Sequence, residues 1–186
     1  MEDFSSKKNN VRKEVALLKS KLSRQESNTR SEEVFATLEA IDLFHKAKNI
    51  FIYHSLKDEV QTMDFINRWK GEKNFYLPVI DNDDLSFRKF TSQEALTPAS
   101  LGILEPEGEN ITDYRKVDLI IVPGVAFDRK MNRLGRGKGY YDRFLAKVSA
   151  PKIGICFDFQ LMDQIPAEAY DIKMDYIVSE NEILWQ

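Results

Sequence analysis

The stretch Asp118-Leu119-Ile120-Ile121-Val122 is apolar from its second residue on and leads directly into Pro123-Gly124-Val125-Ala126-Phe127-Asp128. An apolar run without alternation is typical of a strand in a parallel sheet that is covered on both faces. In such sheets, ligands bind beyond the carboxyl ends of the strands. We therefore predict a binding site just after Val122.

A glycine-rich loop follows this strand and carries most of the functional signal. Cations alternate with three glycines in Arg133-Leu134-Gly135-Arg136-Gly137-Lys138-Gly139-Tyr140-Tyr141-Asp142. Glycine lets a backbone approach an anion closely, and successive amides can line an anion site. From Asp128 to Arg143 there are six basic residues against two acidic ones, in a chain with a formal net charge of -3. The loop is therefore predicted to bind phosphate groups.

The spacing of this loop is also compatible with plainer roles. Alternate glycines can serve only to turn a surface loop, and aromatic residues at a helix start can belong to the core. The chain has no Walker motif, and the spacing differs from the Gly-x-Gly-x-x-Gly of dinucleotide sites. Cations threaded through glycines between a buried strand and a helix start nevertheless favour an anion site.

The rest of the chain alternates between helix and strand patterns. Apolar spacing predicts one helix carrying Val11 to Leu22, another carrying Val34 to Phe44 with Ser31 as its N-cap, and two more over residues 62–70 and 140–148. Strands are predicted over residues 49–54, 75–80, 85–90, 118–122, 152–157 and 176–179, the last being the final strand, with a turn at 81–84. This order indicates an α/β fold over residues 1–186, a single domain with a mostly parallel central sheet flanked by helices in a Rossmann-like layered arrangement.

Composition excludes several classes of protein. The chain of 186 residues can bury one substantial core and is too acidic for a bulk polyanion binder, so we expect no nucleic acid as a partner. The lone Cys156 lies in an apolar run, which favours a buried structural thiol over a reactive one. No run has the length of a membrane span, and the N-terminus lacks a signal-peptide core. We expect a cytoplasmic protein without a membrane partner, and a monomer.

Residues 123–128 and 133–142 together resemble the signature of the 5-formyltetrahydrofolate cyclo-ligase family, also called methenyltetrahydrofolate synthetases. Further landmarks occur in the family's order and cover nearly the whole chain: Lys8 with Arg12, Asp58-Glu59-Val60 with Thr62, Gly102-Ile103-Leu104-Glu105-Pro106, and Asp171 with Asp175. Tyr170 departs from the pattern, because many members have histidine there, and His54 stands where the family varies.

The resemblance implies a reaction in which ATP and 5-formyltetrahydrofolate give 5,10-methenyltetrahydrofolate, ADP and phosphate, with Mg²⁺ required. Both substrates are small molecules, and ATP is a co-substrate. A formamide is a poor electrophile with a poor leaving group, and phosphorylation of the formyl oxygen corrects both defects. Such chemistry needs positioning and neutralised phosphate charge, which the predicted loop offers.

We assign the nucleotide to two segments. Arg136 and Arg133 can hold phosphate oxygens through their planar forks, while Lys138 can follow the transferring group as a compact charge. Two cations four residues apart share one helix face, so the N-terminal pair suits a second clamp, although without the resemblance it would be read as a solvated face. The full ATP set is Lys8, Arg12, Arg133, Leu134, Gly135, Arg136, Gly137, Lys138, Gly139, Tyr140 and Tyr141, with Arg136, Lys138 and Tyr141 as catalytic residues.

Metal and folate are assigned to carboxylates and aromatic residues. The resemblance favours Asp142 and Asp171 as Mg²⁺ ligands, although alone they could be a first-turn helix charge and a turn residue. Glu59 can accept two parallel donors from a pterin edge, or can be a carboxylate at a helix start. Tyr141 and His54 complete the predicted folate set.

Two alternative functions use the same residues. A catalytically idle nucleotide or folate sensor would bind ATP without turnover, and a missing metal or substrate carboxylate would favour it; none is missing. An RNA-binding module is less consistent, because it would not need Asp142, Asp171 and Glu59. Salt dependence separates it from a magnesium-dependent ATP site.

Overall fold

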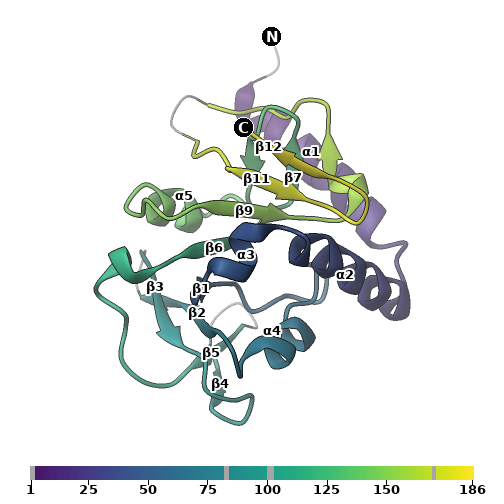
Figure 1. The fold of residues 1–186 in the computed structure, drawn as a ribbon. Helices are drawn as coiled ribbons and strands as arrows, with labels where there is room; N and C mark the ends of the chain where they lie inside the picture. Colours follow the sequence, from purple (N-terminus) through teal and green to yellow (C-terminus); the bar gives the residue numbers. More distant parts are fainter. Residues whose placement is uncertain (1–2, 82–83, 100–102, 169–170) are drawn as a thin grey trace.

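A parallel sheet forms the centre of the protein, as the sequence predicts (Figure 1). The computed structural model describes residues 3–81, 84–99, 103–168 and 171–186. Within these ranges, seven strands form the main sheet in the order β12-β11-β9-β6-β1-β2-β3. The neighbours from β11 to β2 are parallel, and the edge strands β12 and β3 are antiparallel. Their bounds are β1 Asn49–Phe51, β2 Asn74–Asp81, β3 Asp84–Lys89, β6 Leu119–Pro123, β9 Lys152–Ile155, β11 Tyr176–Val178 and β12 Ile183–Trp185.

Helices cover the sheet on both faces because its strands are apolar on both faces. Ile50 and Ile121 pack toward α2, α3 and α4, which lie together on one side of the sheet in Figure 1. Phe51 and Ile120, their neighbours in sequence, pack toward α5 instead. Side chains alternate along a strand, so the continuous apolar runs serve two cores. The bounds of these helices are α2 Arg24–Glu39, α3 Asp42–Lys46, α4 Met63–Trp69 and α5 Tyr140–Leu145.

A smaller sheet carries the N-terminal helix α1 (Phe4–Lys19). It contains β10 (Leu161–Met162), β7 (Ala126–Asp128) and β8 (Arg133–Leu134). Val15 of α1 is fully buried in a cluster with Ala126 and Leu134. This packing brings α1 to the glycine-rich loop, far away in sequence. The remaining elements are β4 (Leu96–Pro98) paired with β5 (Leu104–Pro106), and the 3₁₀ turns η2 (Tyr114–Lys116) and η3 (Asp158–Gln160).

Several predicted boundaries were wrong for local reasons. Ser31 is no N-cap: α2 begins at Arg24, where Ser23 and Glu26 form a capping box, and the Ser31 hydroxyl donates to the Ser27 carbonyl inside the helix. The same helix ends at Glu39, so the apolar pattern through Phe44 belongs to two helices. Leu22 lies beyond the end of α1, and α5 stops at Leu145 rather than at residue 148.

The final strand was also predicted wrongly. β11 is followed by β12, which reverses direction and pairs with it from Tyr176 opposite Trp185 to Val178 opposite Ile183. Part of the predicted turn at 81–84 and Gly102 of the landmark segment lie outside the described residues, as does Tyr170. Cys156 is fully buried, which confirms its predicted burial.

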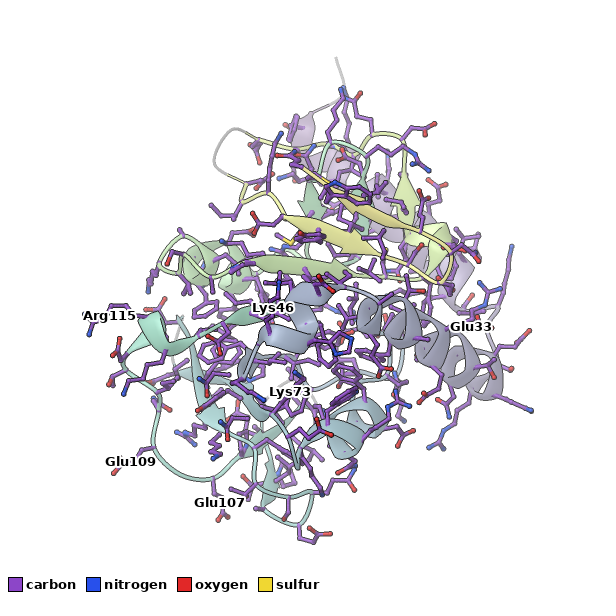
Figure 2. All side chains as sticks on the ribbon, in the orientation of Figure 1. Glu33, Lys46, Lys73, Glu107, Glu109 and Arg115 are labelled. Carbon is purple, nitrogen blue, oxygen red and sulfur yellow. The ribbon has the colours of Figure 1, made fainter. Side chains whose placement is uncertain are left out.

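A buried lysine, Lys73, binds the carboxyl end of α3 at the edge of the core. The Lys73 ammonium donates to the carbonyls of Phe44, His45 and Ala47 at distances of 2.8, 3.1 and 2.9 Å. It therefore caps the carboxyl end of α3 and satisfies carbonyls that the short helix leaves unpaired. Figure 2 shows Lys73 among the packed side chains, whereas Arg115 extends outward at the edge of the molecule.

The hairpin of β7 and β8 separates the main sheet from the glycine-rich loop, and the sequence pattern did not predict it. Fully buried Asp128 holds its turn: the carboxylate accepts from the Lys130 and Asn132 amides at 2.9 Å each, from the Asn132 side chain at 2.9 Å and from the Ile165 amide at 3.0 Å. Met131 adopts a φ of 66° in this turn. The loop therefore starts from a fixed base after Leu134 rather than at the end of β6.

Candidate active site

A cavity of about 1070 Å³ opens where the carboxyl ends of β1 and β6 meet the glycine-rich loop and α1. This is the edge of the sheet at which a ligand site was expected. The cavity brings together every residue that the sequence assigned to nucleotide, folate or metal: Lys8, Arg12, His54, Glu59, the segment Arg133–Asp142 and Asp171.

The loop itself has the backbone that its glycines predict. Gly137 and Gly139 adopt φ angles of 103° and 71°, which residues with a Cβ atom rarely take. Arg12 from α1 donates through Nε to the Gly135 carbonyl at 3.0 Å. Its guanidinium also lies against Gly137, where an added Cβ atom would stand 3.4 Å from Nη2. The loop therefore passes close beneath the N-terminal helix.

Lys8, one helical turn before Arg12, pairs with two carboxylates. Its ammonium lies 2.8 Å from Glu168 Oε2 and 3.1 Å from Asp171 Oδ2. The Asp171 oxygen also accepts from the Glu168 amide at 2.8 Å. Burial opposes the charge of Lys8, but the hydrogen bonds and charges of Glu168 and Asp171 outweigh burial and raise its pKa. Lys8 therefore stays cationic at the cavity wall.

Arg136 links the loop to the opposite wall of the cavity. Its Nη2 lies 2.7 Å from Asp58 Oδ1 and 3.0 Å from Glu59 Oε1. Glu59 also accepts from the Leu56 amide through Oε2 at 3.0 Å, so the carboxylate is fixed in place. Burial opposes the charge of Arg136, while Glu59 and Asp58 raise its pKa. A predicted phosphate ligand and a predicted pterin ligand thus form an ion pair.

Arg133 occupies a different position although it belongs to the same signature. Its side chain is only 3% exposed, and Nη2 lies 2.7 Å from Asp142 Oδ1. Nη1 donates to the Pro123 carbonyl at 3.3 Å, and the guanidinium lies 5.6 Å from the centre of the Tyr141 ring. Arg133 therefore joins the end of β6 to the first turn of α5.

Lys138 differs from Arg136 in having no charged partner among the described residues. It is exposed, and across the described ranges no hydrogen bond or ion pair engages its ammonium group. Only its backbone carbonyl is held, by Arg143 Nη1 at 3.2 Å. An ammonium on a loop whose backbone is held at several points can meet a phosphate with little rearrangement.

Unpaired buried polar atoms gather at this cavity. Of the side chains that the structure describes, four have a buried polar atom without a hydrogen-bond partner, and three of these line the cavity: His54 through Nδ1, Arg133 through Nε and Tyr141 through Oη. Buried polar atoms in proteins are normally paired. Burial raises the pKa of Tyr141 far above its ordinary value, and the nearby Glu59 adds to the shift, so the phenol keeps its proton. Burial lowers the pKa of His54, which favours the neutral imidazole.

The structure adds wall residues that the sequence pattern did not assign. Pro78 and Ile80 of β2, Leu85 of β3 and Ile103 form an apolar side of the cavity, and Glu105 fixes the Ile80 amide at 3.0 Å. Glu168, the partner of Lys8, was also missed. Ile80 could have been predicted, because it lies near the carboxyl end of a predicted strand, where ligands bind in such sheets. Nothing in the local sequence indicated that Glu168 lines the cavity.

This constellation can be compared with known proteins. A sequence model of the 5-formyltetrahydrofolate cyclo-ligase family matches residues 4–180, which is nearly the whole chain. The chain belongs to this family. The family assignment confirms the resemblance carried by the glycine-rich signature.

Curated members of the cyclo-ligase family align along almost their full length. A probable 5-formyltetrahydrofolate cyclo-ligase of Schizosaccharomyces pombe is 32% identical over 97% of this chain and 98% of its own. The 5-formyltetrahydrofolate cyclo-ligase of Mus musculus is 31% identical over 95% of each chain. Among solved structures, the 5,10-methenyltetrahydrofolate synthetase of Aquifex aeolicus matches with a TM-score of 0.86 and 36% identity, covering 96% of this chain and 92% of its own. The predicted fold class is therefore confirmed.

Two further observations concern membrane-spanning helices and metal-binding clusters. Within the described ranges, no helix combines the length and apolar character that crossing a membrane requires. In that same part of the chain, no cluster of three or more histidine, cysteine, aspartate or glutamate side chains is arranged to hold a metal ion. The cytoplasmic location and the monomeric state stay predictions.

Proposed function

We propose that this chain is an ATP-dependent 5-formyltetrahydrofolate cyclo-ligase, which forms 5,10-methenyltetrahydrofolate, ADP and phosphate. The observation that carries the proposal is that one cavity has a cationic glycine loop on one side and, facing it, the fixed Glu59 carboxylate and the buried Tyr141 hydroxyl. Family membership and the names of the relatives point to the same reaction.

The chemistry divides into phosphorylation and ring closure. The formyl oxygen attacks the terminal phosphorus of ATP, and ADP leaves. Nitrogen 10 of the folate then attacks the activated formyl carbon and loses its proton. Finally, the electron pair of nitrogen 5 expels phosphate as the carbon–oxygen bond breaks, giving the methenyl cation. Each step develops or moves charge on phosphate oxygens, so the protein acts by positioning and neutralisation.

The loop and α1 supply the nucleotide side of the site. We expect Lys138, which is exposed and lines the cavity, to follow the transferred phosphoryl group, and Arg12 lies against the glycine backbone. We expect the loop amides near Gly137 and Gly139 to approach phosphate oxygens, because a residue without a Cβ atom both takes these positive φ angles readily and lets the backbone come close to an anion. Lys8 adds a second charge from the same helix face.

The opposite wall supplies the folate side. Glu59 can accept two donors from a pterin edge once Arg136 turns from it toward phosphate. The protonated Tyr141 hydroxyl and the neutral His54 ring both carry buried atoms in need of a partner, which suits hydrogen bonds to the substrate. The apolar wall that includes Ile80 and Leu85 can cover the flat ring system.

Magnesium fits the donor set if the phosphates complete its coordination. Asp142 uses Oδ1 for Arg133, and Asp171 uses Oδ2 for Lys8, so each carboxylate retains one oxygen outside these contacts. Mg²⁺ commonly takes one or two carboxylates together with phosphate oxygens and water. When bound, Mg²⁺ neutralises phosphate charge. Asp142 and Asp171 are therefore the residues that we expect to hold it.

The deciding experiment is a spectroscopic assay of turnover. Purified protein is mixed with ATP, Mg²⁺ and 5-formyltetrahydrofolate, and the near-ultraviolet absorbance of the methenyl product is followed in time. Growth of that band only when ATP is present supports the proposal. ATP binding without any growth would instead identify a sensor, and binding of nucleic acid that weakens steeply with salt would identify an RNA module.

A further inference from the structure

The two arginines at the start of the glycine-rich loop have opposite surroundings. The Arg136 side chain is 47% exposed and pairs with carboxylates across the cavity, whereas the Arg133 side chain is 3% exposed. Arg133 Nε is buried, and none of the described residues provides it with an acceptor. Arg133 lines the cavity, but its guanidinium is therefore almost closed to solvent.

The Arg133 guanidinium engages two acceptors of the protein. Nη2 holds Asp142 Oδ1 at 2.7 Å, and Nη1 reaches the Pro123 carbonyl at 3.3 Å. To reach a phosphate, the guanidinium would have to leave both acceptors, including a partly buried carboxylate. Removing the partner of such a carboxylate is costly, because the charge is then left without compensation.

Arg133 is also closely packed by its neighbours Tyr141 and Gly135. The Tyr141 ring lies against the guanidinium, with 5.6 Å between the ring centre and Cζ. A Cβ atom at Gly135 would stand only 2.9 Å from Nη1, so this glycine leaves room for the arginine. Three neighbouring segments thus meet at one fixed side chain.

We propose that Arg133 is a positioning residue that orients the Asp142 carboxylate and the Tyr141 ring for magnesium and ATP, and that it does not itself contact the phosphates. Groups that orient a metal ligand typically change metal affinity 10- to 100-fold when they are altered. The proposal rests on the proposed function only in that ATP and Mg²⁺ bind at this cavity.

The test compares one substitution at three arginines. ATP affinity is measured by calorimetry for the wild type, Arg133→Lys, Arg136→Lys and Arg129→Lys, first in chelator and then across a Mg²⁺ titration. Arg129 is the matched control, because it pairs with Glu182 at 2.9 Å on the surface, away from the cavity. Circular dichroism verifies that each variant is folded.

The proposal predicts a split between the two site variants. Arg133→Lys should leave metal-free ATP affinity within about 2-fold of wild type but raise the Mg²⁺ concentration for half-maximal tightening by about 10-fold. Arg136→Lys should weaken metal-free ATP binding by about 10-fold with an unchanged Mg²⁺ midpoint. Arg129→Lys should change neither. If Arg133→Lys instead weakens metal-free ATP binding as Arg136→Lys does, the proposal is wrong.

A double-mutant cycle separates orientation from general damage. If Arg133 acts through Asp142, then Asp142→Asn and the double variant Arg133→Lys with Asp142→Asn should have the same Mg²⁺ midpoint. Additive shifts would overturn the proposal. Should Arg133→Lys fail to fold, guanidinium resonances of the wild type decide: the Arg133 signal should move when Mg²⁺ joins the ATP complex, and a large movement with metal-free ATP would contradict the proposal.

These measurements are independent of turnover. Because they use ATP and Mg²⁺ without folate, a protein that forms no methenyl product can still give the predicted split. In that case the proposed reaction fails while the role of Arg133 stands. If the wild type makes product but the two variants show no split, the proposed reaction stands and the proposed role of Arg133 is wrong.

Discussion

The two halves of the glycine-rich signature differ in almost every physical respect. The first half, the hairpin segment 124–134, contains buried Phe127 and Asp128 and a nearly buried Arg133. The second half, the loop segment 135–139, exposes Arg136 and Lys138 and has two glycines at positive φ. One half is fixed by internal contacts, and the other presents charge to the cavity.

This difference teaches that one continuous motif can contain residues needed for the fold and residues needed for a ligand. The hairpin residues form hydrogen bonds and packing contacts with the rest of the protein, so their identities maintain the local structure. Of the loop cations, Lys138 has no ion partner among the described residues, and Arg136 pairs with Asp58 and Glu59 across the cavity. We therefore expect the identities of these cations to serve a ligand. Substitutions in the hairpin should therefore lower stability, and substitutions in the loop should lower activity at constant stability.

The largest expected effect is on stability, from Asp128→Asn. The amide would turn an NH₂ group toward one pair of backbone or side-chain donors that the carboxylate now accepts. Since hydrogen bonds to a buried charged acceptor contribute about 1.5–3 kcal/mol each, we expect a loss of about 3–5 kcal/mol in the free energy of unfolding. Urea unfolding followed by circular dichroism measures it.

The control for this prediction is Asp163→Asn, because the Asp163 side chain is fully exposed. It should change the free energy of unfolding by less than about 0.5 kcal/mol. The folded fraction of the Asp128 variant should retain its turnover. Unchanged stability with lost turnover would move Asp128 from the fixed half to the functional half.

In the loop, Lys138→Ala should lower turnover by about 100-fold, the size of effect seen when one stabilising contact to transition-state charge is lost. Lys130→Ala is the matched control, since Lys130 lies in the hairpin turn and, within the described part of the chain, its ammonium reaches only Gln164 Oε1, at 3.3 Å. The control should retain turnover within about 2-fold, and both variants should unfold at the wild-type urea concentration. Equal losses at the two lysines would remove the argument for a specific phosphate contact.

A smaller effect is expected where the hairpin meets the main sheet. Gly154 of β9 faces the Phe127 ring, and a Cβ atom there would stand 2.4 Å from a ring carbon. Gly154→Ala should therefore overpack the core and cost about 2 kcal/mol of stability. Gly71→Ala is the control, because nothing lies within 4 Å of its added Cβ atom. If Gly154→Ala were neutral, the hairpin would be looser than its contacts indicate.

The sequence predicted the sheet well because its strands are marked by apolar composition. Residues 118–122, 75–80 and 152–157 are apolar enough to be recognised without their neighbours, and each became a parallel strand within a residue or two. The hairpin was missed because its strands are short and its turn depends on Asp128 reaching Ile165, a contact far apart in sequence. The edge strand β12 was missed for a similar reason, since its pairing with β11 is what defines it.

The site residues were predictable as a set, but their relations were not. Motif spacing identified the lining of one cavity, including Lys8 and Asp171, which are far apart in the chain. The sequence assigned both Arg133 and Arg136 to phosphate oxygens, while the structure gives them different partners. Burial decides such differences, and burial depends on the tertiary fold.

The smallest expected effect tests how much the ion pair between Asp58 and Arg136 stabilises the loop segment 135–139. Asp58 pairs with Arg136 at 2.7 Å, and both side chains are nearly half exposed, so the pair should contribute less than about 1 kcal/mol. Burial acts to raise the pKa of Asp58, but Lys19 and Arg136 outweigh it and lower the pKa below its ordinary value of 3.8. A lowered carboxyl pKa means stability that is present above pH 3.8 and is lost as the pH falls through the folded pKa.

The stability gap between wild type and Asp58→Asn should therefore be small at pH 7 and should close as the pH falls below 3.8. Urea unfolding at a series of pH values measures the gap, and about 1 M salt should close it at neutral pH because exposed pairs are screened. A gap that persists in acid and in salt would mean that Asp58 holds the loop by uncharged contacts. Arg136 would then be fixed as firmly as the hairpin, and the loop could not release Glu59 at the low cost that the proposed reaction requires.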